Sequence, residues 1–308
     1  MSAEMSRSRA DRCPGVLRPW PAEDGLLVRL RLVGGRVPAA TLVALISIAE
    51  QYGDGRVHLT SRANLQLRAL PADARGQVPA EVVAAIEATG LLPSRSHELA
   101  RNIMMSPQAG LDMLGAWEVQ DPSAGRGAAD LRPMAVELDR LLCAAPALER
   151  LPGRFLFVLD DGRGDLLDRP CDLGLVALSA ELAQLRVGEG WGPVVPLASA
   201  ARELVGLAGE FVVRRGSGPE AAWHVRELIE PLVHAVATRP VPGGNSTGLP
   251  FGQVAGGVHV GVPDGVAATL AAELAAQAGE AGQLVVTPWR GVLVPTPDRE
   301  PTTTQEPR

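Results

Sequence analysis

The chain has 308 residues and a formal net charge of −6, and hydrophobic residues make up 46% of it and charged residues 21%. These proportions are typical of a globular protein and exclude an intrinsically disordered one. The acidic balance argues against a protein that coats nucleic acid or an anionic membrane, so we expect neither as a partner. The sequence shows no apolar run of membrane-spanning length and no signal-peptide core, which predicts a cytoplasmic protein.

The first 90 residues alternate strand and helix patterns. Residues 26–32 alternate apolar and polar side chains with period two, which predicts a strand with one buried face. Two glycines then predict a turn, and apolar residues at helical spacing follow. The expected order is a strand at 26–32, a helix at 38–52, strands at 57–60 and 64–68, and a helix at 79–89.

The same order of patterns returns near the C-terminus, with a strand at 258–262, a helix through Leu274 and an apolar stretch at 284–294. Gly35 and Gly265 are 230 residues apart, and Thr60 and Thr287 are 227 residues apart. Since this offset is nearly constant, we infer an internal repeat whose two copies pack together, because neither copy is long enough to cover its own sheet.

The two copies differ in charge. His259 stands where the first copy has Arg29, and Gly261 stands where it has Arg31. The first copy therefore carries the positive charge.

Residues 96–239 alternate strands and helices differently, which predicts an α/β layer domain. Helices are expected at 131–143, 198–213 and 219–236, and strands at 154–159 and 172–177. His224 and His234 fall on the last helix without a metal-ligand partner, and we interpret both as structural or surface residues. The aspartates of the turn at 160–165 lack the spacing of a calcium loop, so no metal site is predicted.

A set of arginine and amide side chains is the first candidate site. Strand alternation places Arg29 with Arg31 on one face, and Asn64 with Gln66 on one face of a neighbouring strand, with Arg62 just before it. Guanidinium groups bind carboxylates through two hydrogen bonds. These residues form either an ordinary solvated sheet face or a carboxylate-binding one.

Ser106 followed by Pro107 is a second candidate. The pair suits the first residues of a helix, whose free amides bind anions, and the same pair is also common as a plain helix cap.

With these features established, the chain resembles the nitrite/sulfite reductase family, most closely its branch in aerobic cobalamin synthesis. The resemblance extends over about residues 13–297. It rests on DGLLVRLRLVGG (24–35), LTSRANLQ (59–66), RNIMMSPQAG (101–110), LPGRF (151–155), LPFG (249–252) and TPWRG (287–291).

The resemblance implies two pseudo-symmetric ferredoxin-like half-units packed with a central α/β domain, and a tetrapyrrole bound in the cleft between them. It implies that the tetrapyrrole carboxylates or the reacting anion contact a set of polar residues in the first half-unit and the central domain. These are Arg31 or Arg29, Arg62 and Arg101, with Asn64, Gln66 and Asn102 beside them, and Arg154, which stands at the position of a basic active-site residue in the reductases.

The resemblance also implies a [4Fe–4S] cluster with iron held by four cysteines of a further domain. This sequence ends at Arg308 and has three cysteines, Cys13, Cys143 and Cys171, which match no cluster, zinc or disulfide spacing. We therefore expect the cluster cysteines to be absent from this chain and a separate iron–sulfur or electron-donor polypeptide to be a partner.

Three functions remain open. The first is an oxidoreductase that binds a carboxylate-rich tetrapyrrole for oxygen-dependent hydroxylation and lactonisation. The second is a non-catalytic tetrapyrrole-binding protein or truncated remnant. The third is a component of a sirohaem-dependent nitrite or sulfite reductase, which we rank last because such enzymes favour lysine at the anion site and this sequence has none.

The expected organisation divides the chain into six parts. They are a flexible N-terminus at 1–13, a first half-unit at 14–95, a tetrapyrrole-cleft domain at 96–239, a linker at 240–248, a second half-unit at 249–297 and a disordered tail at 298–308.

Overall fold

The computed structural model describes residues 11, 13–111, 126–218, 220–237, 248–279 and 282–296. Most of the expected N-terminal segment and linker, and all of the expected tail at 298–308, lie outside these ranges. Within the described ranges, no helix has both the length and the apolar character to cross a membrane.

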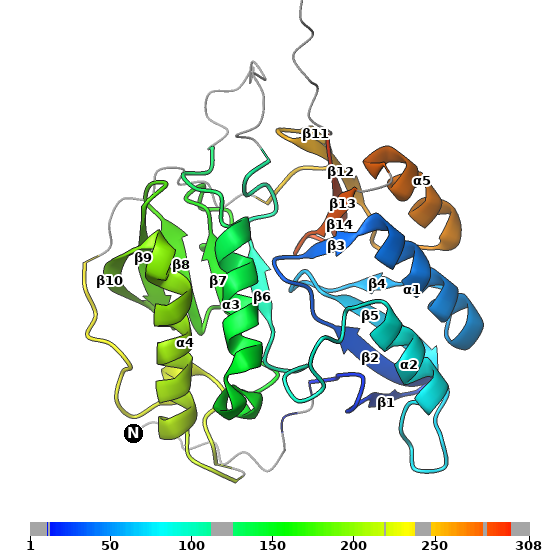
Figure 1. Ribbon diagram of the computed structural model, residues 1–308, viewed down its shortest axis with the longest axis horizontal. Coiled ribbons are helices and arrows are strands. Elements are labelled where there is room, and N and C mark those ends of the chain that lie inside the picture. The colour runs from blue at the N-terminus through cyan, green and yellow to red at the C-terminus, as the bar shows by residue number, and fades with distance from the viewer. Residues whose placement is uncertain are drawn as a thin grey trace, which may run out of the picture.

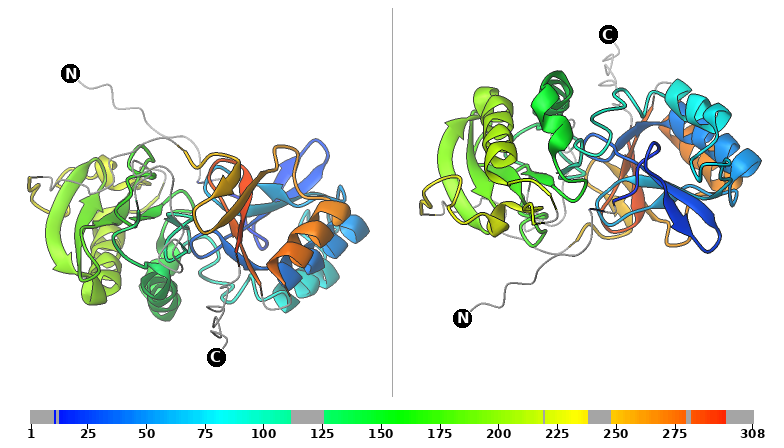
Figure 2. Two further views of the ribbon diagram at one scale, coloured as in Figure 1. Left: turned by 90° about the horizontal axis from the view of Figure 1, so that it is seen from above. Right: turned by 90° about the horizontal axis from the view of Figure 1, so that it is seen from below.

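The described elements form two lobes that lie side by side (Figures 1 and 2). The repeat lobe is built from both ends of the chain, residues 20–88 and 252–295. The central lobe contains the elements between residues 103 and 237. The chain therefore forms the first copy of the repeat, crosses to the central lobe, and returns to complete the repeat lobe.

The repeat lobe contains the strands and helices predicted from the two copies of the pattern. Its first copy comprises β1 (Trp20–Ala22), β2 (Gly25–Leu30), β3 (Arg36–Pro38), α1 (Ala39–Tyr52), β4 (His58–Leu59), β5 (Leu65–Leu70) and α2 (Ala80–Ala88). Its second copy comprises β11 (Gly252–Val254), β12 (Gly257–Gly261), α5 (Ala268–Ala278), β13 (Gln283–Val286) and β14 (Gly291–Pro295). The stretch at 284–294 is thus two antiparallel strands joined by a turn.

The two copies have the same sheet topology, which confirms the internal repeat. The first sheet has the order β1-β2-β5-β4, and the second has the corresponding order β11-β12-β14-β13 with β3 added at its edge. The copies therefore exchange backbone: β3, just before α1, pairs with β13 of the other copy. In the opposite direction, Val266, just before α5, bridges to Val57 beside β4.

The turn before the last strand is the same in both copies. The Thr60 amide donates to the Asn64 carbonyl at 2.9 Å, and the Thr287 amide donates to the Gly291 carbonyl at 2.9 Å. Each threonine Oγ1 also accepts a backbone N–H, from Asn64 at 3.1 Å and from Gly291 at 3.2 Å. By this correspondence, Trp289 in the second copy occupies the position of Arg62 in the first.

Helices α1, α2 and α5 cover the side of the repeat lobe that faces away from the central lobe (Figure 1). Proline lies directly before both α1 and α2, at Pro38 and Pro79, where its fixed φ suits a helix start. Leu42 and Leu45 of α1 and Leu274 of α5 are buried in one apolar core with the strands. This shared core joins the two copies into one lobe.

The central lobe is a mixed five-stranded sheet with two helices on one face (Figure 1). Its strands lie in the order β10 (Gly190–Pro196), β9 (Leu182–Val187), β8 (Leu173–Ala177), β7 (Phe157–Asp160) and β6 (Ile103–Met105), and its helices are α3 (Arg132–Ala144) and α4 (Leu197–Arg214). Strands β6, β7 and β8 are parallel, and β9 and β10 are antiparallel to their neighbours. Phe155, Phe157 and Phe211 form the centre of its core.

Three features of the central lobe differ from what the sequence predicted. The described part of the predicted helix at 219–236, residues 220–236, is irregular chain with one 3₁₀ turn, Val225–Glu227. The Glu227 carboxylate accepts the backbone N–H groups of Trp223 and His224, and Pro231 lies further along. The antiparallel strands β9 and β10 were not foreseen. Ser106 begins a turn rather than a regular helix: the Ala109 amide donates to the Ser106 carbonyl at 3.0 Å, and residues 107–111 form turns.

The exchange between the copies predicts that Gly35 tolerates no side chain. Gly35 has φ +74°, and a Cβ there would overlap the carbonyl oxygen of Val286. Gly35→Ala should lower the free energy of unfolding by about 3 kcal/mol in urea denaturation, from backbone strain and the clash together.

The matched control is Gly55→Ala, because Gly55 has φ +77° and open space where the Cβ would lie. It should cost about 1 kcal/mol, from backbone strain alone. Equal costs for the two substitutions would contradict a close approach of the copies at Gly35.

Candidate functional site

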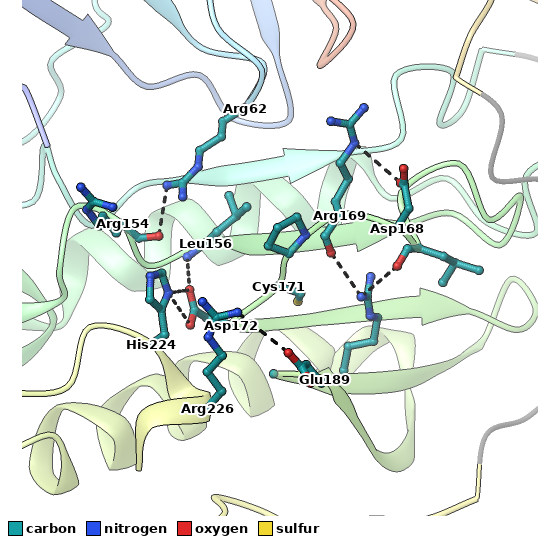
Figure 3. A pocket seen from close by; sticks show the side chains of 14 residues that line it. Arg62, Arg154, Leu156, Asp168, Arg169, Cys171, Asp172, Glu189, His224 and Arg226 are labelled. Atoms are coloured by element: carbon teal, nitrogen blue, oxygen red, sulfur yellow. Dashed lines mark hydrogen bonds and ion pairs between the residues drawn. The ribbon is translucent and has the colours of Figure 1, made fainter. Parts of the chain in front are cut away.

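A cavity of about 400 Å³ opens between the two lobes (Figure 3). Its volume lies within the usual range of ligand sites. The repeat lobe contributes Arg62, and the central lobe contributes Arg154, Leu156, Leu167, Asp168, Arg169, Pro170, Cys171, Asp172, Arg186, Gly188, Glu189, His224 and Arg226. Five arginines against three carboxylates make this cavity suited to anions.

Arg62 and Arg154 meet where the two lobes meet. Arg62 is at the tip of the turn before β5, and its Nη1 donates to the Arg154 carbonyl at 3.1 Å. The Arg154 guanidinium lies 5.1 Å from the centre of the Trp223 ring and 3.9 Å from the Asp11 carboxylate, and its side chain is half exposed. Both guanidinium groups therefore keep donors available to a ligand.

Arg169 and Arg186 have different roles on the central-lobe side. The Arg169 guanidinium is 5.6 Å from the Trp289 ring, so the two corresponding turns of the repeat both reach this region. Arg186 donates to the carbonyls of Leu166, Leu167 and Arg169 at 3.2–3.4 Å. Arg186 therefore shapes the loop that carries Arg169.

Arg29 and Arg31 lie outside the residues that line this cavity. Burial is the main cause, and repulsion from the nearby Arg29 charge a smaller one, that lowers the pKa of Arg31 to about 10. The Arg31 Nη1 and Nη2 atoms donate to the carbonyls of Pro14 at 3.3 Å and Gly153 at 3.5 Å. Burial, with repulsion from Arg62 and Arg154, also lowers the pKa of Arg29. The Nε atoms of Arg29 and Arg31 are buried without a hydrogen-bond partner. Their contact with a ligand stays a prediction.

Asn64 and Asn102 bond to each other rather than face the cavity. The Asn64 Nδ2 donates to the Asn102 Oδ1 at 2.9 Å, and the Asn64 Oδ1 accepts the Leu32 N–H at 2.9 Å. Asn102 in turn donates to the Phe155 carbonyl at 3.1 Å. These side chains tie the Arg62 turn to strands of both lobes. Gln66 is half-buried opposite Arg29 in the pairing of β2 with β5 and does not line the cavity.

Arg101 forms a buried ion pair within the central lobe. Its Nε and Nη2 donate to the two Asp139 carboxylate oxygens at 2.6 and 2.9 Å, and the Arg101 side chain is 6% exposed. The ion pair uses the Nε and Nη2 donors of Arg101 and anchors the start of β6 to α3. Arg101 does not line the cavity, and its contact with a ligand stays a prediction.

The second copy of the repeat is neutral at the position of Arg29. His259 is 1% exposed, its Nδ1 is 2.9 Å from the Pro250 carbonyl, and its Nε2 is 2.9 Å from the Thr287 Oγ1. Because a carbonyl only accepts, Nδ1 carries the proton and Thr287 donates to Nε2. Burial lowers the pKa of His259, so it stays uncharged near neutral pH. At this matched position the positive charge thus belongs to the first copy, as the sequence indicated.

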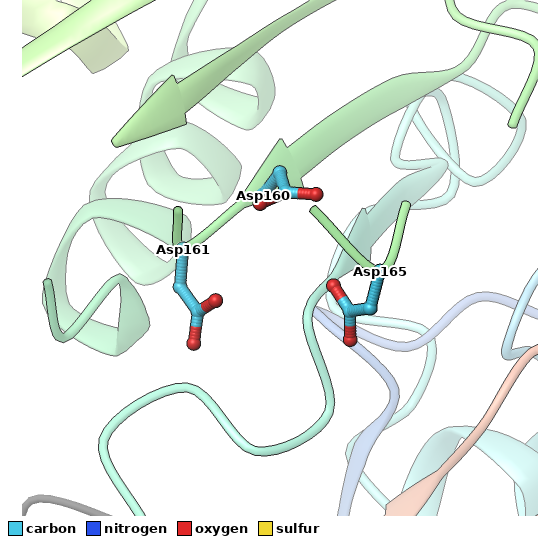
Figure 4. A group of neighbouring side chains, drawn as sticks. All are labelled: Asp160, Asp161 and Asp165. Carbon is cyan, nitrogen blue, oxygen red and sulfur yellow. The ribbon is translucent and has the colours of Figure 1, made fainter. Parts of the chain in front are cut away.

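Three buried aspartates lie close together at the end of β7 and in the loop after it (Figure 4). Carboxylate oxygens of Asp160, Asp161 and Asp165 come within 4.8 Å of one another. Asp160 accepts backbone N–H groups at 2.9–3.0 Å, Asp161 pairs with Arg163 at 2.7 Å, and Asp165 accepts the Ser106 hydroxyl at 2.6 Å. These carboxylates are therefore occupied in holding the loop after β7.

The three thiols do not fit a four-thiolate cluster. Cys13 lies in the N-terminal segment against Gly153, Cys143 lies in α3, and Cys171 lies at the cavity before β8. Burial raises the pKa of all three thiols, that of Cys171 to about 12. They are thus dispersed and protonated, and this chain supplies neither the number nor the arrangement of ligands that a [4Fe–4S] cluster needs.

Sequence analysis missed Arg169, His224 and Arg226 at the cavity. Arg169 lies in the irregular chain before β8, whereas His224 and Arg226 lie much further along the chain, at the 3₁₀ turn Val225–Glu227. No periodic pattern indicates that these side chains lie near one another. The wrong prediction of a helix at 219–236 also placed His224 and Arg226 on a regular element.

Comparison with known proteins identifies the fold. Residues 20–85 match the nitrite/sulfite reductase ferredoxin-like half domain. Among solved structures, that of Mycobacterium tuberculosis NirA matches with a TM-score of 0.67 at 20% identity, over 93% of this chain and 60% of that one. The chain has the nitrite/sulfite reductase fold, and residues 20–85 belong to that family's half domain.

Two curated relatives extend the comparison. A precorrin-3B synthase from a Sinorhizobium species is 30% identical over 213 residues, which is 67% of this chain and 40% of that protein. A ferredoxin–nitrite reductase from Leptolyngbya laminosa is 31% identical over 111 residues, which is 35% of this chain and 21% of that protein. The resemblance predicted from the sequence is thus confirmed, and the chain spans less than half the length of these relatives.

The internal pairing of Arg101 predicts a structural role. Arg101→Ala should lower the free energy of unfolding by about 3 kcal/mol, because it leaves the Asp139 carboxylate unpaired in a mostly buried position. Arg95→Ala, which removes an exposed pair with Glu87, should leave stability nearly unchanged in the same chemical denaturation. A stable Arg101→Ala protein would argue against this assignment.

The aspartate group predicts a pH-dependent stability. Burial, with repulsion from Asp160 and Asp161, raises the pKa of Asp165 to about 8, against about 4 in an unfolded chain. Between these values the folded state holds a proton that the unfolded state has lost, so the free energy of unfolding should fall as pH rises from about 4 to about 8.

Asp165→Asn should flatten this part of the pH profile, because the amide cannot ionise and its oxygen still accepts the Ser106 hydroxyl. Denaturation at several pH values measures the slope for both proteins. An unchanged slope in the variant would show that Asp165 is ionised in the folded protein.

Proposed function

We propose that this chain holds a carboxylate-rich tetrapyrrole in the arginine-lined cavity and serves a precorrin-3B synthase-like oxidoreductase of aerobic cobalamin biosynthesis. The ligand is precorrin-3A, and the reaction is its oxygen-dependent hydroxylation and lactonisation. The carrying observation is the cavity between the lobes, where Arg62 of the repeat meets Arg154 and Arg169 of the central lobe. The similarity to a precorrin-3B synthase supports this choice of ligand.

The arginines are suited to orienting the ligand more than to supplying its whole affinity. Three charge-assisted hydrogen bonds contribute at most about 5–9 kcal/mol. Association costs of about 4–15 kcal/mol offset most of that. Burial of the macrocycle between the lobes must therefore contribute much of the binding free energy, while the guanidinium groups set its orientation through its carboxylates.

Electron supply is a separate part of the proposal. Because the three thiols do not fit a cluster, the electrons come in this proposal from another iron–sulfur or electron-donor polypeptide. The same observation favours a second candidate, a tetrapyrrole-binding protein without redox chemistry of its own. Iron and acid-labile sulfide measured on the purified protein test the observation on which both candidates rest: a cluster in the isolated chain would contradict our interpretation of its cysteines.

Binding of a tetrapyrrole tests the central claim. Uroporphyrin III, a soluble tetrapyrrole with eight carboxylates, should bind the purified protein with saturable quenching of its fluorescence. Arg62→Gln should weaken binding about tenfold, through loss of one charge-assisted contact.

Arg75→Gln removes the same charge from an exposed loop that does not line the cavity and should bind as the wild type does. Thermal unfolding of both variants confirms that they are folded. Absence of saturable binding to the wild type, or equal effects of the two substitutions, would refute the proposal.

A further inference from the structure

The chain just after its masked N-terminal residues is anchored in the repeat lobe. Val16 is 1% exposed and lies in the core of that lobe. The Glu98 carboxylate accepts the N–H groups of Val16 at 2.7 Å and Leu17 at 3.2 Å. A Cβ on Gly15 would overlap this carboxylate, so the backbone approaches Glu98 closely. Residues 15–17 are therefore a firm anchor.

Asp11, Cys13 and Pro14 precede this anchor, and we call them the strap head. The Arg31 Nη1 donates to the Pro14 carbonyl at 3.3 Å, and the Arg18 Nη2 donates to the Cys13 carbonyl at 3.0 Å. Both acceptors are neutral, and the bond from Arg31 is longer than is usual for an N–H donor. The arginine contacts of the strap head are therefore weaker than those a carboxylate would make.

Asp11 brings a negative charge to the edge of the cavity. Its carboxylate accepts the N–H groups of Gly153 at 2.6 Å and Cys13 at 3.0 Å. It lies 3.9 Å from the Arg154 Nε and 3.9 Å from the Arg18 Nη2, and its side chain is 12% exposed. Arg154 lines the cavity, whereas Asp11 does not. A carboxylate of the protein itself thus occupies the backbone N–H next to a cavity arginine.

Arg29 and Arg31 lie beside the strap head without a charged partner. The described residues give neither guanidinium an ion pair, and the Nε of each is buried without a hydrogen-bond partner. The Arg31 Nη2, the Cys13 Cβ and an Asp11 carboxylate oxygen all surround the α-carbon of Gly153. A ligand carboxylate that reached this place would replace neutral acceptors of Arg31 with a charged one.

Like charges gather where the strap head meets the cavity. Arg62 and Arg154 lie together at the cavity edge (Figure 3). Their repulsion acts on Arg29 in addition to burial, and both lower its pKa. Such a group of cations favours an anion in its midst. Asp11 offsets part of the charge in the empty protein, and an anionic ligand would do the same.

We propose that the strap head is an internal competitor of the ligand: Asp11 occupies a carboxylate position beside Gly153 and Arg154 in the empty protein, and a ligand carboxylate displaces it. Displacement frees Arg31 from the Pro14 carbonyl. The anchor at residues 15–17 stays in place, so the strap head closes again when the ligand leaves. The inference rests on the proposed function, since it needs a ligand with carboxylates in the adjoining cavity.

Titrations with uroporphyrin III measure the competition. Asp11→Asn removes the charge and keeps the size of the side chain, and it should bind uroporphyrin about fivefold more tightly than the wild type, because less of the protein is held in the closed arrangement. Asp264→Asn removes the same charge from an exposed turn that does not line the cavity and should bind as the wild type does. Thermal unfolding of both variants confirms that they are folded.

Cys13 reports the position of the strap head independently of affinity. It is 8% exposed in the closed arrangement. Saturating uroporphyrin should raise the rate of Cys13 alkylation by iodoacetamide about fivefold, because the strap head is then displaced. Mass spectrometry of the peptides separates the thiols. Cys143 of α3 lies outside the strap head and the cavity and should react at the same rate with and without the ligand.

The outcomes separate this inference from the proposed function. If the wild type binds no uroporphyrin, both fail. If the wild type binds, but Asp11→Asn binds no more tightly than Asp264→Asn or the ligand leaves the Cys13 rate unchanged, the competition alone is overturned. Weaker binding by Asp11→Asn would overturn it as well, and would make Asp11 a positioning residue for Arg154.

Discussion

The exchange of backbone between the two copies of the repeat determines the shape of the site. Strand β3 of the first copy completes the sheet of the second, and Val266 of the second bridges to Val57 of the first. Each copy thereby fixes the position of the other. Because the exchange is reciprocal, the two corresponding turns, with Arg62 and Trp289 at equivalent positions, both reach the central lobe.

Charge is distributed unequally over this symmetric frame. The first copy has Arg29 and Arg31, whereas the second has a neutral His259 bonded to Thr287 and the Pro250 carbonyl. The residue that the repeat lobe contributes to the cavity lining, Arg62, belongs to the cationic copy. Trp289 of the second copy contacts the Arg169 guanidinium and does not itself line the cavity.

Many of the arginines in this chain form ion pairs and hydrogen bonds within the protein. Arg101 is paired with Asp139, Arg163 with Asp161, and Arg186 holds three carbonyls of one loop. A planar guanidinium can bond several acceptors at once, so it is well suited to organising irregular loops. What distinguishes Arg62, Arg154 and Arg226 is that their charge has only weak or long pairing with protein carboxylates, or none, among the described residues.

The sequence by itself determined the repeat, the main strands and helices of the repeat lobe and the family resemblance, because period-two alternation, helical spacing and glycine positions are local properties. It also singled out Arg62 and Arg154. It did not predict the short strands β1, β3 and β11, of which β3 pairs with the other copy. Only the tertiary structure decided which polar residues face the cavity: Arg101 and Asn64 found partners distant in sequence, whereas Arg169, His224 and Arg226 came together from separate irregular segments. Whether a side chain is free for a ligand depends on which groups the fold brings within hydrogen-bonding distance, and no local pattern contains that information.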